Sequence, residues 1–187
     1  MPGDRVRRVA QTVGALAAVA VVAVAATIYL GAYDVAADVP HARPVVWLLE
    51  LARDRSIAVR ARRILVPTDL GDSARIAAGA GLYDDMCSGC HLAPGMERTE
   101  ISRGLNPRAP ELERRSGLTP AESFWIIKHG VKMTGMAAWG RTHSDTLIWD
   151  MVAFLQRLPA LTPDQYRALV KSAPADHDEM MMGRAAR

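Results

Sequence analysis

Cysteine and aromatic residues are scarce in this chain. Of its 187 residues only two are cysteine, and only 5% are aromatic. Both cysteines lie in one short segment, so no cysteines remain elsewhere for a structural disulfide. A structural zinc site needs about four ligands, usually as two Cys or Cys/His pairs, and no second pair exists. The low aromatic content predicts only a modest apolar core.

Two further patterns are missing. The basic residues, which give a net charge of +3 and a pI of about 9.1, are not interleaved with aromatics. Nucleic acid is therefore not expected as a partner. No nucleophile with a neighbouring base, and no paired carboxylates in a defined frame, stand out in the sequence. The sequence thus predicts no separate enzyme active site.

The two cysteines belong to a compact motif, the run Cys87-Ser88-Gly89-Cys90-His91. C-x-x-C-H is the attachment signature of a c-type haem. The two thiols can add across the two vinyl groups of the porphyrin, and His91 is then held below the ring as an axial ligand. The alternative, a thioredoxin-like dithiol, needs a βαβ context, whereas the flanking sequence is helical. We predict one haem c, covalently attached through Cys87 and Cys90.

A second axial ligand is predicted in the loop after His129, which carries three glycines and joins two helical segments. Such a loop can pass close to a haem face. Met136 is the first choice because Gly135 directly precedes it, and Met133 is the runner-up. The alternative is a bis-histidine haem with His129 or His143. Otherwise His129 is expected to end a helix and His143 to lie at the surface or cap a helix.

Residues from Ser73 to about Pro159 resemble a small class I cytochrome c domain. A helix leads into the C-x-x-C-H run, and a further helix, the methionine loop and a final helix follow in the order of that family. The resemblance implies an all-α fold around one covalent haem. It implies thioether bonds at Cys87 and Cys90, with His91 as the proximal ligand and Met136 as the distal ligand of the iron.

The same resemblance assigns supporting roles. Pro94 would supply the carbonyl group that accepts a hydrogen bond from the ligand imidazole. Gly79 and Tyr83 would pack where the first helix of the domain crosses the last, near Phe154. Ala137 follows the predicted distal ligand at a position where the family usually has proline, which makes this loop less rigid.

Local signals predict several helices independently. Thr119-Pro120-Ala121-Glu122 forms a capping box with proline in the first helical position, and the helix that it opens ends at Gly130. Apolar residues at helical spacing predict the closing helix from Ser144 to Pro159. A further capping box, Thr162-Pro163-Asp164-Gln165, predicts a short trailing helix.

A long uncharged segment precedes the haem motif. Val9 to Tyr33 is a run of 25 residues without a formal charge, and at about 1.5 Å per residue it can cross a hydrocarbon core of about 30 Å. A cleavable signal peptide is the alternative, but its apolar region is only about 7–15 residues long. We predict a retained transmembrane anchor. Arg5, Arg7 and Arg8 precede the run, which predicts a cytoplasmic N-terminus and a haem domain on the other side of the membrane. The resemblance to cytochrome c implies the same side, the periplasmic face of a bacterial inner membrane.

The predicted organisation has five parts: a basic cytoplasmic N-terminus (1–12), a transmembrane anchor (13–33), a juxtamembrane amphipathic helix with a basic linker (34–72), a cytochrome c domain (73–160), and a short helix with a disordered tail (161–187). The amphipathic helix is expected over Pro44–Arg53, with Trp47 as an interfacial anchor. The arginines after it suit a solvated linker, anionic headgroups or an acidic partner. Methionines in the tail segment 176–182 would suit copper(I).

These features together predict a membrane-tethered monohaem cytochrome c that carries single electrons between periplasmic or membrane redox partners. With histidine and methionine both bound to the iron, no position is open for a substrate, so the chain is expected to be an electron carrier and not an enzyme. One alternative is a haem-based gas sensor with a labile methionine ligand. Another is a haem subunit of a larger oxidase or dehydrogenase, with the transmembrane helix as its docking element.

Overall fold

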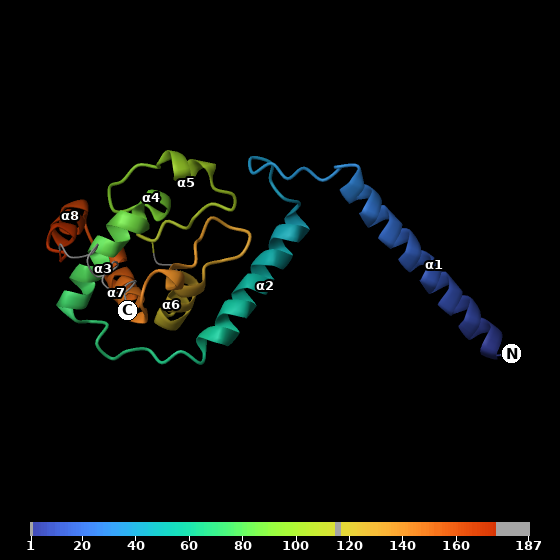
Figure 1. The fold of residues 1–187 in the computed structure, drawn as a ribbon, viewed down its shortest axis with the longest axis horizontal. Helices are drawn as coiled ribbons and strands as arrows, with labels where there is room; N and C mark the ends of the chain where they lie inside the picture. Colours follow the sequence, from blue (N-terminus) through green and yellow to red (C-terminus); the bar gives the residue numbers. More distant parts are fainter. Residues whose placement is uncertain (1, 115–116, 175–187) are drawn as a thin grey trace. The chain divides into compact units, whose positions relative to one another are not determined.

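The structure is a computed structural model that describes residues 2–114 and 117–174 (Figure 1). Among these residues every regular element is a helix and none is a strand, which confirms the predicted all-α fold class. The chain separates into two compact units, Met1–Val39 and Pro40–Arg187. The tail segment 176–182, with its predicted copper ligands, lies outside the described residues.

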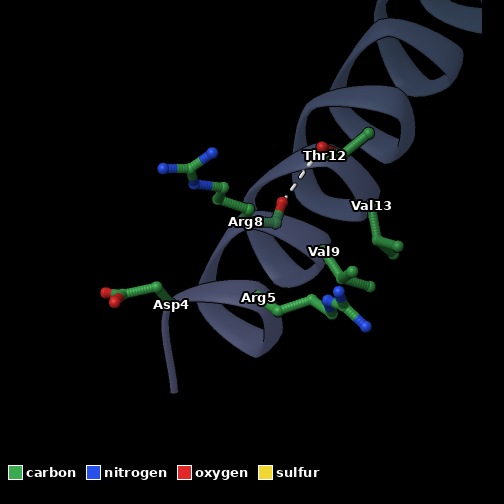
Figure 2. A pocket seen from close by; sticks show the side chains of 6 residues that line it. All are labelled: Asp4, Arg5, Arg8, Val9, Thr12 and Val13. Carbon is green, nitrogen blue, oxygen red and sulfur yellow. Dashed lines mark hydrogen bonds between the residues drawn. The ribbon is translucent and has the colours of Figure 1, made fainter. Parts of the chain in front are cut away.

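The first unit consists mainly of α1 (Pro2–Tyr29). Its segment Gly3–Tyr29 has 27 residues and contains an 18-residue stretch with a mean hydropathy of 2.2, so it is long and apolar enough to cross a membrane. A signal sequence meets the same criterion, so retention of the anchor stays a prediction. A shallow hollow at the start of α1 is lined by Asp4, Arg5, Arg8, Val9, Thr12 and Val13 (Figure 2). All six belong to one helix, so the hollow is an open gap between neighbouring side chains.

The second unit carries the remaining helices. In chain order they are α2 (Arg43–Ala61), α3 (Ser73–Met86), α4 (Ser88–His91), α5 (Glu100–Gly104), α6 (Pro120–His129), η1 (Trp139–Arg141), α7 (Asp145–Arg157), η2 (Leu158–Ala160) and α8 (Pro163–Lys171). The capping boxes predicted at Thr119 and Thr162 are present and open α6 and α8. α2 extends well beyond Pro44–Arg53, so Arg55 and Arg60 lie on a helix and not in a linker.

The centre of the second unit is the crossing of α3 and α7, which pack against each other (Figure 1). A Cβ atom on Gly79 would lie 1.9 Å from the carbonyl oxygen of Asp150 and 2.9 Å from Cβ of Phe154. Only glycine therefore allows this approach of the two backbones. The ring centroids of Tyr83 and Phe154 are 5.2 Å apart. The predicted crossing near Phe154 is confirmed.

Further helices cover this centre. α6 packs on α7, and the rings of Phe124 and Trp149 stack with centroids 4.2 Å apart. Buried side chains around this pair form a cluster, here called the α6–α7 cluster: Leu82, Phe124, Ile127, Leu147, Ile148, Trp149, Met151 and Val152. α2 packs against α6 and buries Ile57 and Ala61. α8 packs against α3 and buries Tyr166.

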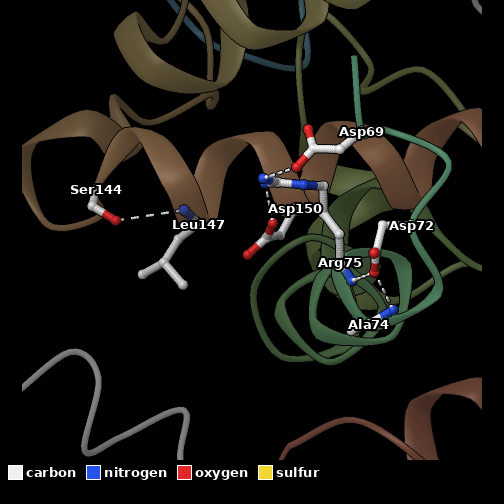
Figure 3. A network of polar contacts seen from close by, with 7 residues as sticks. All are labelled: Asp69, Asp72, Ala74, Arg75, Ser144, Leu147 and Asp150. Atoms are coloured by element: carbon white, nitrogen blue, oxygen red, sulfur yellow. Dashed lines mark hydrogen bonds and ion pairs between the residues drawn. The ribbon is translucent and has the colours of Figure 1, made fainter. Parts of the chain in front are cut away.

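A polar contact joins α3 to α7 beside the crossing (Figure 3). Arg75 donates from Nη1 to Asp150 at 2.5 Å and from Nη2 to Asp69 at 2.9 Å. Burial raises the pKa of Asp150 and the charge of Arg75 opposes this shift. The hydrogen bond from Arg75 lowers the pKa of the exposed Asp69. Asp72 and Ser144 cap the first turns of α3 and α7 in the same region.

Candidate haem-binding site

The predicted haem motif folds as a single helical turn directly after α3. The backbone N–H of Cys87 donates to Tyr83 and ends α3, and the N–H of His91 donates back to the carbonyl oxygen of Cys87 at 2.8 Å. Leu92 then takes a positive φ of 62° and ends α4. Residues three and four positions apart on a helical turn share one face. The turn therefore brings Cys87, Cys90 and His91 to the same side.

Two hydrogen bonds fasten this turn to its surroundings. The hydroxyl of Tyr83 donates to the carbonyl oxygen of Leu92 at 2.5 Å, which ties the end of α4 back to α3. The hydroxyl of Thr99 donates to the carbonyl oxygen of Gly89 at 2.5 Å from the segment that leads into α5. Burial raises the pKa of Tyr83 far above its ordinary value, so this phenol stays a donor at every physiological pH.

The imidazole of His91 is fixed by a backbone acceptor. Its Nδ1–H donates to the carbonyl oxygen of Pro110 at 2.8 Å. Because a carbonyl group can only accept, the proton is on Nδ1 and Nε2 is left with its lone pair. Burial lowers the pKa of His91, and the hydrogen bond to Pro110 opposes this effect. A neutral imidazole with Nε2 available is the form that binds a metal.

The resemblance predicts Pro94 as the acceptor, and this prediction is therefore wrong. After the positive φ of Leu92 the chain turns back within Ala93–Met96, where the N–H of Met96 donates to Ala93. The segment around Pro110 instead runs along the motif, and the N–H of Leu112 donates to His91 at 3.4 Å. The sequence carries only a weak signal for this contact, a proline in an irregular segment 19 positions after the histidine.

The two candidate distal ligands have opposite environments. Met133 is 82% exposed and has a positive φ of 59° at the tip of its loop. Met136 is partly buried against the α6–α7 cluster, and Cys87 packs against the same cluster. The burial of Met136 and its shared neighbours with the haem motif favour it over Met133. The assignment of Met136 as distal ligand stays a prediction.

The backbone at Met136 is held by its own loop. The N–H of Val131 donates to the carbonyl oxygen of Met136 at 3.2 Å. The hydroxyl of Thr134 accepts from the N–H of Met136 at 3.1 Å and donates to Val131 at 2.8 Å. A Cβ atom on Gly130, which has a φ of 65°, would lie 2.7 Å from the same carbonyl oxygen. These contacts restrain the loop where Ala137 replaces the proline usual in the family.

The methionine loop also contacts the segment that follows the haem motif. A Cβ atom on Gly135 would lie 2.6 Å from Cδ2 of Leu105, the residue directly after α5. The glycine before Met136 thus leaves room for a side chain from another loop. The two segments that follow α5 and α6 meet at this point.

The two histidines on either side of the methionine loop lie in different environments. His129 is the last residue of α6, as expected, and its ring centroid lies 5.0 Å from that of Trp125. His143 is buried, so the expected surface position is wrong. Its ring meets the edge of Trp139 with centroids 5.4 Å apart, because η1 brings that tryptophan onto it.

The Cys87 thiol is not activated for redox or thiolate chemistry. Burial raises the pKa of the Cys87 thiol to about 12, and the neighbouring Cys90 acts in the same direction. Reactive dithiols and thiolate metal ligands require a lowered thiol pKa. Among the residues that the structure describes, no group of three or more His, Cys, Asp or Glu side chains could hold a bare metal ion. Both observations disfavour a dithiol or a metal–thiolate site.

The residues present fit a covalently bound haem. One helical turn offers two thiols and a neutral imidazole, and the imidazole keeps Nε2 free by donating from Nδ1 to Pro110. A partly buried thioether, Met136, stands in a restrained loop and shares its neighbours with Cys87. This donor set, of two sulfurs for attachment and of imidazole and thioether for iron, is that of a low-spin haem c.

Comparison with known proteins points in the same direction. Residues 74–155 match the family model described as cytochrome C oxidase, cbb3-type, subunit III. The match runs from α3 to α7, so it contains the motif turn, the Pro110 segment and the methionine loop. It does not include α1, α2 or α8. No curated protein and no solved structure matches the chain significantly.

Proposed function

From the premise that residues 74–155 form a c-type cytochrome domain, we propose that the chain is a membrane-anchored monohaem cytochrome c. It carries single electrons between redox partners on the outer face of a bacterial inner membrane. The observation that carries this proposal is the hydrogen bond from Nδ1 of His91 to Pro110, because it prepares the histidine of the C-x-x-C-H turn for iron. A bound haem supplies a one-electron couple whose potential depends on its axial ligands and burial.

The roles of the chain's own residues follow from their chemistry. Cys87 and Cys90 each add S–H across one vinyl C=C bond, with sulfur bonding to one carbon and hydrogen to the other. This addition consumes no oxidant or reductant. His91 binds the iron through Nε2 and Met136 binds through its thioether sulfur. Since the sequence has only two cysteines, it has one such attachment site.

A closed iron supports electron transfer over gas sensing. Thr134, Val131 and Gly130 all contact the backbone of Met136. These restraints hold the methionine in place, so a diatomic gas has to displace a ligand that the loop supports. Electrons then pass through the haem edge to a partner without any bond being made or broken.

The location rests on the N-terminal sequence. α1 is apolar enough to cross a membrane, and Arg5, Arg7 and Arg8 at its start favour a cytoplasmic N-terminus. The haem domain then lies on the opposite side, in the periplasm. Mass spectrometry of the purified protein tests retention of α1, because loss of the first 30 or so residues would show a cleaved signal peptide.

A second candidate function is favoured by the family description. The matched model describes a subunit of a cytochrome oxidase, so the chain is also a candidate haem subunit of a membrane oxidase. In that case the donor or acceptor is a fixed neighbour in a complex. Purification from native membranes in mild detergent separates the two candidates, because a subunit migrates with larger membrane proteins and a free carrier migrates alone.

The absorption spectrum of the purified protein, oxidised and reduced, with and without CO, tests the haem assignment directly. A low-spin c-type spectrum with the weak far-red band of thioether–iron ligation, unchanged by CO, is expected. A high-spin spectrum, or a shift on adding CO to the reduced protein, would show an open or labile sixth position. That result would replace the carrier by a gas-binding protein. Absence of covalent haem would remove the cytochrome proposal itself.

A further inference from the structure

The first part of α2, Arg43–Arg55, is an apolar helix without a covering surface in the structure, and we call it the α2 overhang. Every residue in it is exposed. It contains six large apolar side chains with exposed fractions between 37% and 65%: Val45, Val46, Trp47, Leu48, Leu49 and Leu51. A contiguous group of this kind marks an interaction surface on a soluble domain.

The rest of α2 behaves differently. Beyond the overhang, the helix buries Ile57 and Ala61, and α2 packs against α6. α2 therefore contacts the domain core only from about Ser56 onward. The part of the helix before Ser56 is exposed to solvent. The apolar side chains of the overhang point to several sides of the helix and not to one stripe, so the domain core could not bury them all.

The chain itself brings a bilayer close to the overhang, given the proposed anchor. α1 ends at Tyr29 and α2 begins at Arg43, with 13 residues between them. A fully extended segment of this length spans at most about 45 Å. A helix tethered this closely to a membrane meets its surface at high effective concentration. No other partner is linked to the overhang through the chain in this way.

The charges of α2 complement a lipid surface. α2 has four arginines against Glu50 and Asp54, a net charge of +2, and Arg62 and Arg63 directly after it bring the segment to +4. Arginines flank the apolar run on both sides, at Arg43 and from Arg53 onward. Arginine beside an apolar segment is suited to anionic headgroups, with the apolar side chains in the acyl boundary. Trp47, which is 65% exposed, is of the residue type that gathers at membrane interfaces.

We propose that the α2 overhang lies in the headgroup region of the membrane that holds α1, and that it fixes the haem domain against that membrane. The proposal rests on the membrane anchor of the proposed function. It gives the domain a second, noncovalent attachment through Val45–Leu51. Electron partners are then those that reach a haem held at the membrane surface, and not those that need it to swing free on a flexible linker.

The test uses the full-length, haem-loaded protein in vesicles of phosphatidylcholine and phosphatidylglycerol. A specific protease site is inserted between Leu30 and Ala42, so that cleavage separates α1 from α2. Haem absorbance in the sedimented vesicles is measured before and after cleavage. We expect most of the haem to stay with the vesicles after cleavage.

Substitutions assign the retention to the overhang. Trp47→Asp together with Leu48→Asp should release the haem domain on cleavage. Val59→Asp is the matched control, because Val59 is 54% exposed and Leu48 58% exposed, on the same helix. The control should stay bound. None of the three side chains is buried, so the visible spectrum should be unchanged and report an intact fold.

The outcomes separate this inference from its premise. Protein that fails to sediment before any cleavage overturns the anchor and this proposal together. Sedimentation before cleavage with full release afterwards overturns the overhang contact alone. Release from pure lipid vesicles but retention on native membranes would also overturn it, and would assign the overhang to a membrane protein. Equal release of the Val59→Asp control would show that the retention does not reside in the overhang.

Discussion

The Nδ1–H of His91 donates to the carbonyl oxygen of Pro110, 2.8 Å away and 19 positions along the chain. This contact fixes which imidazole nitrogen carries the proton and which side of the motif turn the later segment covers. The neutral state of His91 has a different cause, because burial lowers its pKa and the hydrogen bond to Pro110 opposes this shift. A ligand imidazole that donates a hydrogen bond is more basic and stabilises the oxidised metal.

Loosening this acceptor should therefore raise the reduction potential. Pro110→Gly keeps the carbonyl group but frees the backbone that positions it. We expect a higher potential than in the wild type, measured by redox titration of the visible spectrum. Pro94→Gly is the matched control, because Pro94 is not the acceptor, and it should change the potential less. A larger shift in Pro94→Gly than in Pro110→Gly would contradict the role given to the His91–Pro110 contact.

Met136→Ala should open the sixth position of the haem iron. Loss of the thioether is expected to remove the weak far-red band and to let the reduced protein bind CO. Met133→Ala should leave both properties unchanged, because Met133 is exposed at the loop tip. The two variants are compared by absorption spectroscopy of the oxidised and reduced proteins. The reverse pattern would transfer the distal role to Met133.

Gly79→Ala should destabilise the domain by separating α3 from α7. The added Cβ would lie 1.9 Å from the carbonyl oxygen of Asp150, which is backbone and cannot rotate away. Overpacking of this kind costs about 1–3 kcal/mol, occasionally more. Unfolding by denaturant, followed through the haem absorbance, measures the difference. Gly104→Ala, where an added Cβ meets nothing within 4 Å, should have a much smaller effect.

The contact of Arg75 with Asp69 should make stability depend on pH. Because the hydrogen bond from Arg75 lowers the pKa of Asp69, the ionised carboxylate stabilises the folded state. This contribution is present above the ordinary carboxyl pKa of about 4 and is lost as pH falls through the lowered value. Asp69→Asn should therefore be less stable than the wild type at pH 7, and the two should converge at low pH. Denaturant unfolding at several pH values checks this, and a difference that grows toward low pH would contradict it.

The buried carboxyl group of Asp150 affects stability with the opposite sign. Burial raises its pKa, so its ionisation as pH rises costs stability, and Arg75 reduces that cost. Asp69→Asn removes the first effect and leaves the pair of Arg75 and Asp150 in place, although it also removes the negative charge by which Asp69 raises the pKa of Asp150. A change of Arg75 would remove both contacts, so Asp69 is the position to change.

Much of the site was predictable because its signals are local. The spacing of Cys87, Cys90 and His91 requires only one helical turn, and the capping boxes at Thr119 and Thr162 are complete within four residues. The crossing at Gly79 was predicted from the resemblance to class I cytochrome c, through a glycine and a tyrosine four residues apart on one helix face. Each of these predictions depends on neighbours in sequence or on one face of one helix.

The errors concern contacts that only the tertiary structure defines. The acceptor for His91 was sought three residues away at Pro94, whereas the chain returns to it at Pro110. His143 is buried because η1 places Trp139 on its ring. Local sequence patterns show neither which distant segment returns to His91 nor how a short 3₁₀ turn packs. The length of α2 was also underestimated, since its last turns are stabilised by packing on α6.

Thr134→Val should show whether the hydrogen bonds of Thr134 help to keep Met136 on the haem iron. The hydroxyl of Thr134 accepts from the N–H of Met136 and donates to Val131, so valine of similar shape removes both hydrogen bonds. With Ala137 in place of the usual proline, the main restraint that remains at Met136 is the hydrogen bond from the N–H of Val131 to its carbonyl oxygen. We expect faster CO binding to the reduced protein and a weaker far-red band, measured by flow spectroscopy. Thr146→Val, at an exposed position of α7, is the control and should bind CO no faster than the wild type. If Thr134→Val is as closed to CO as the wild type, the iron–methionine bond alone holds the loop, and these hydrogen bonds have no part in keeping the sixth position closed.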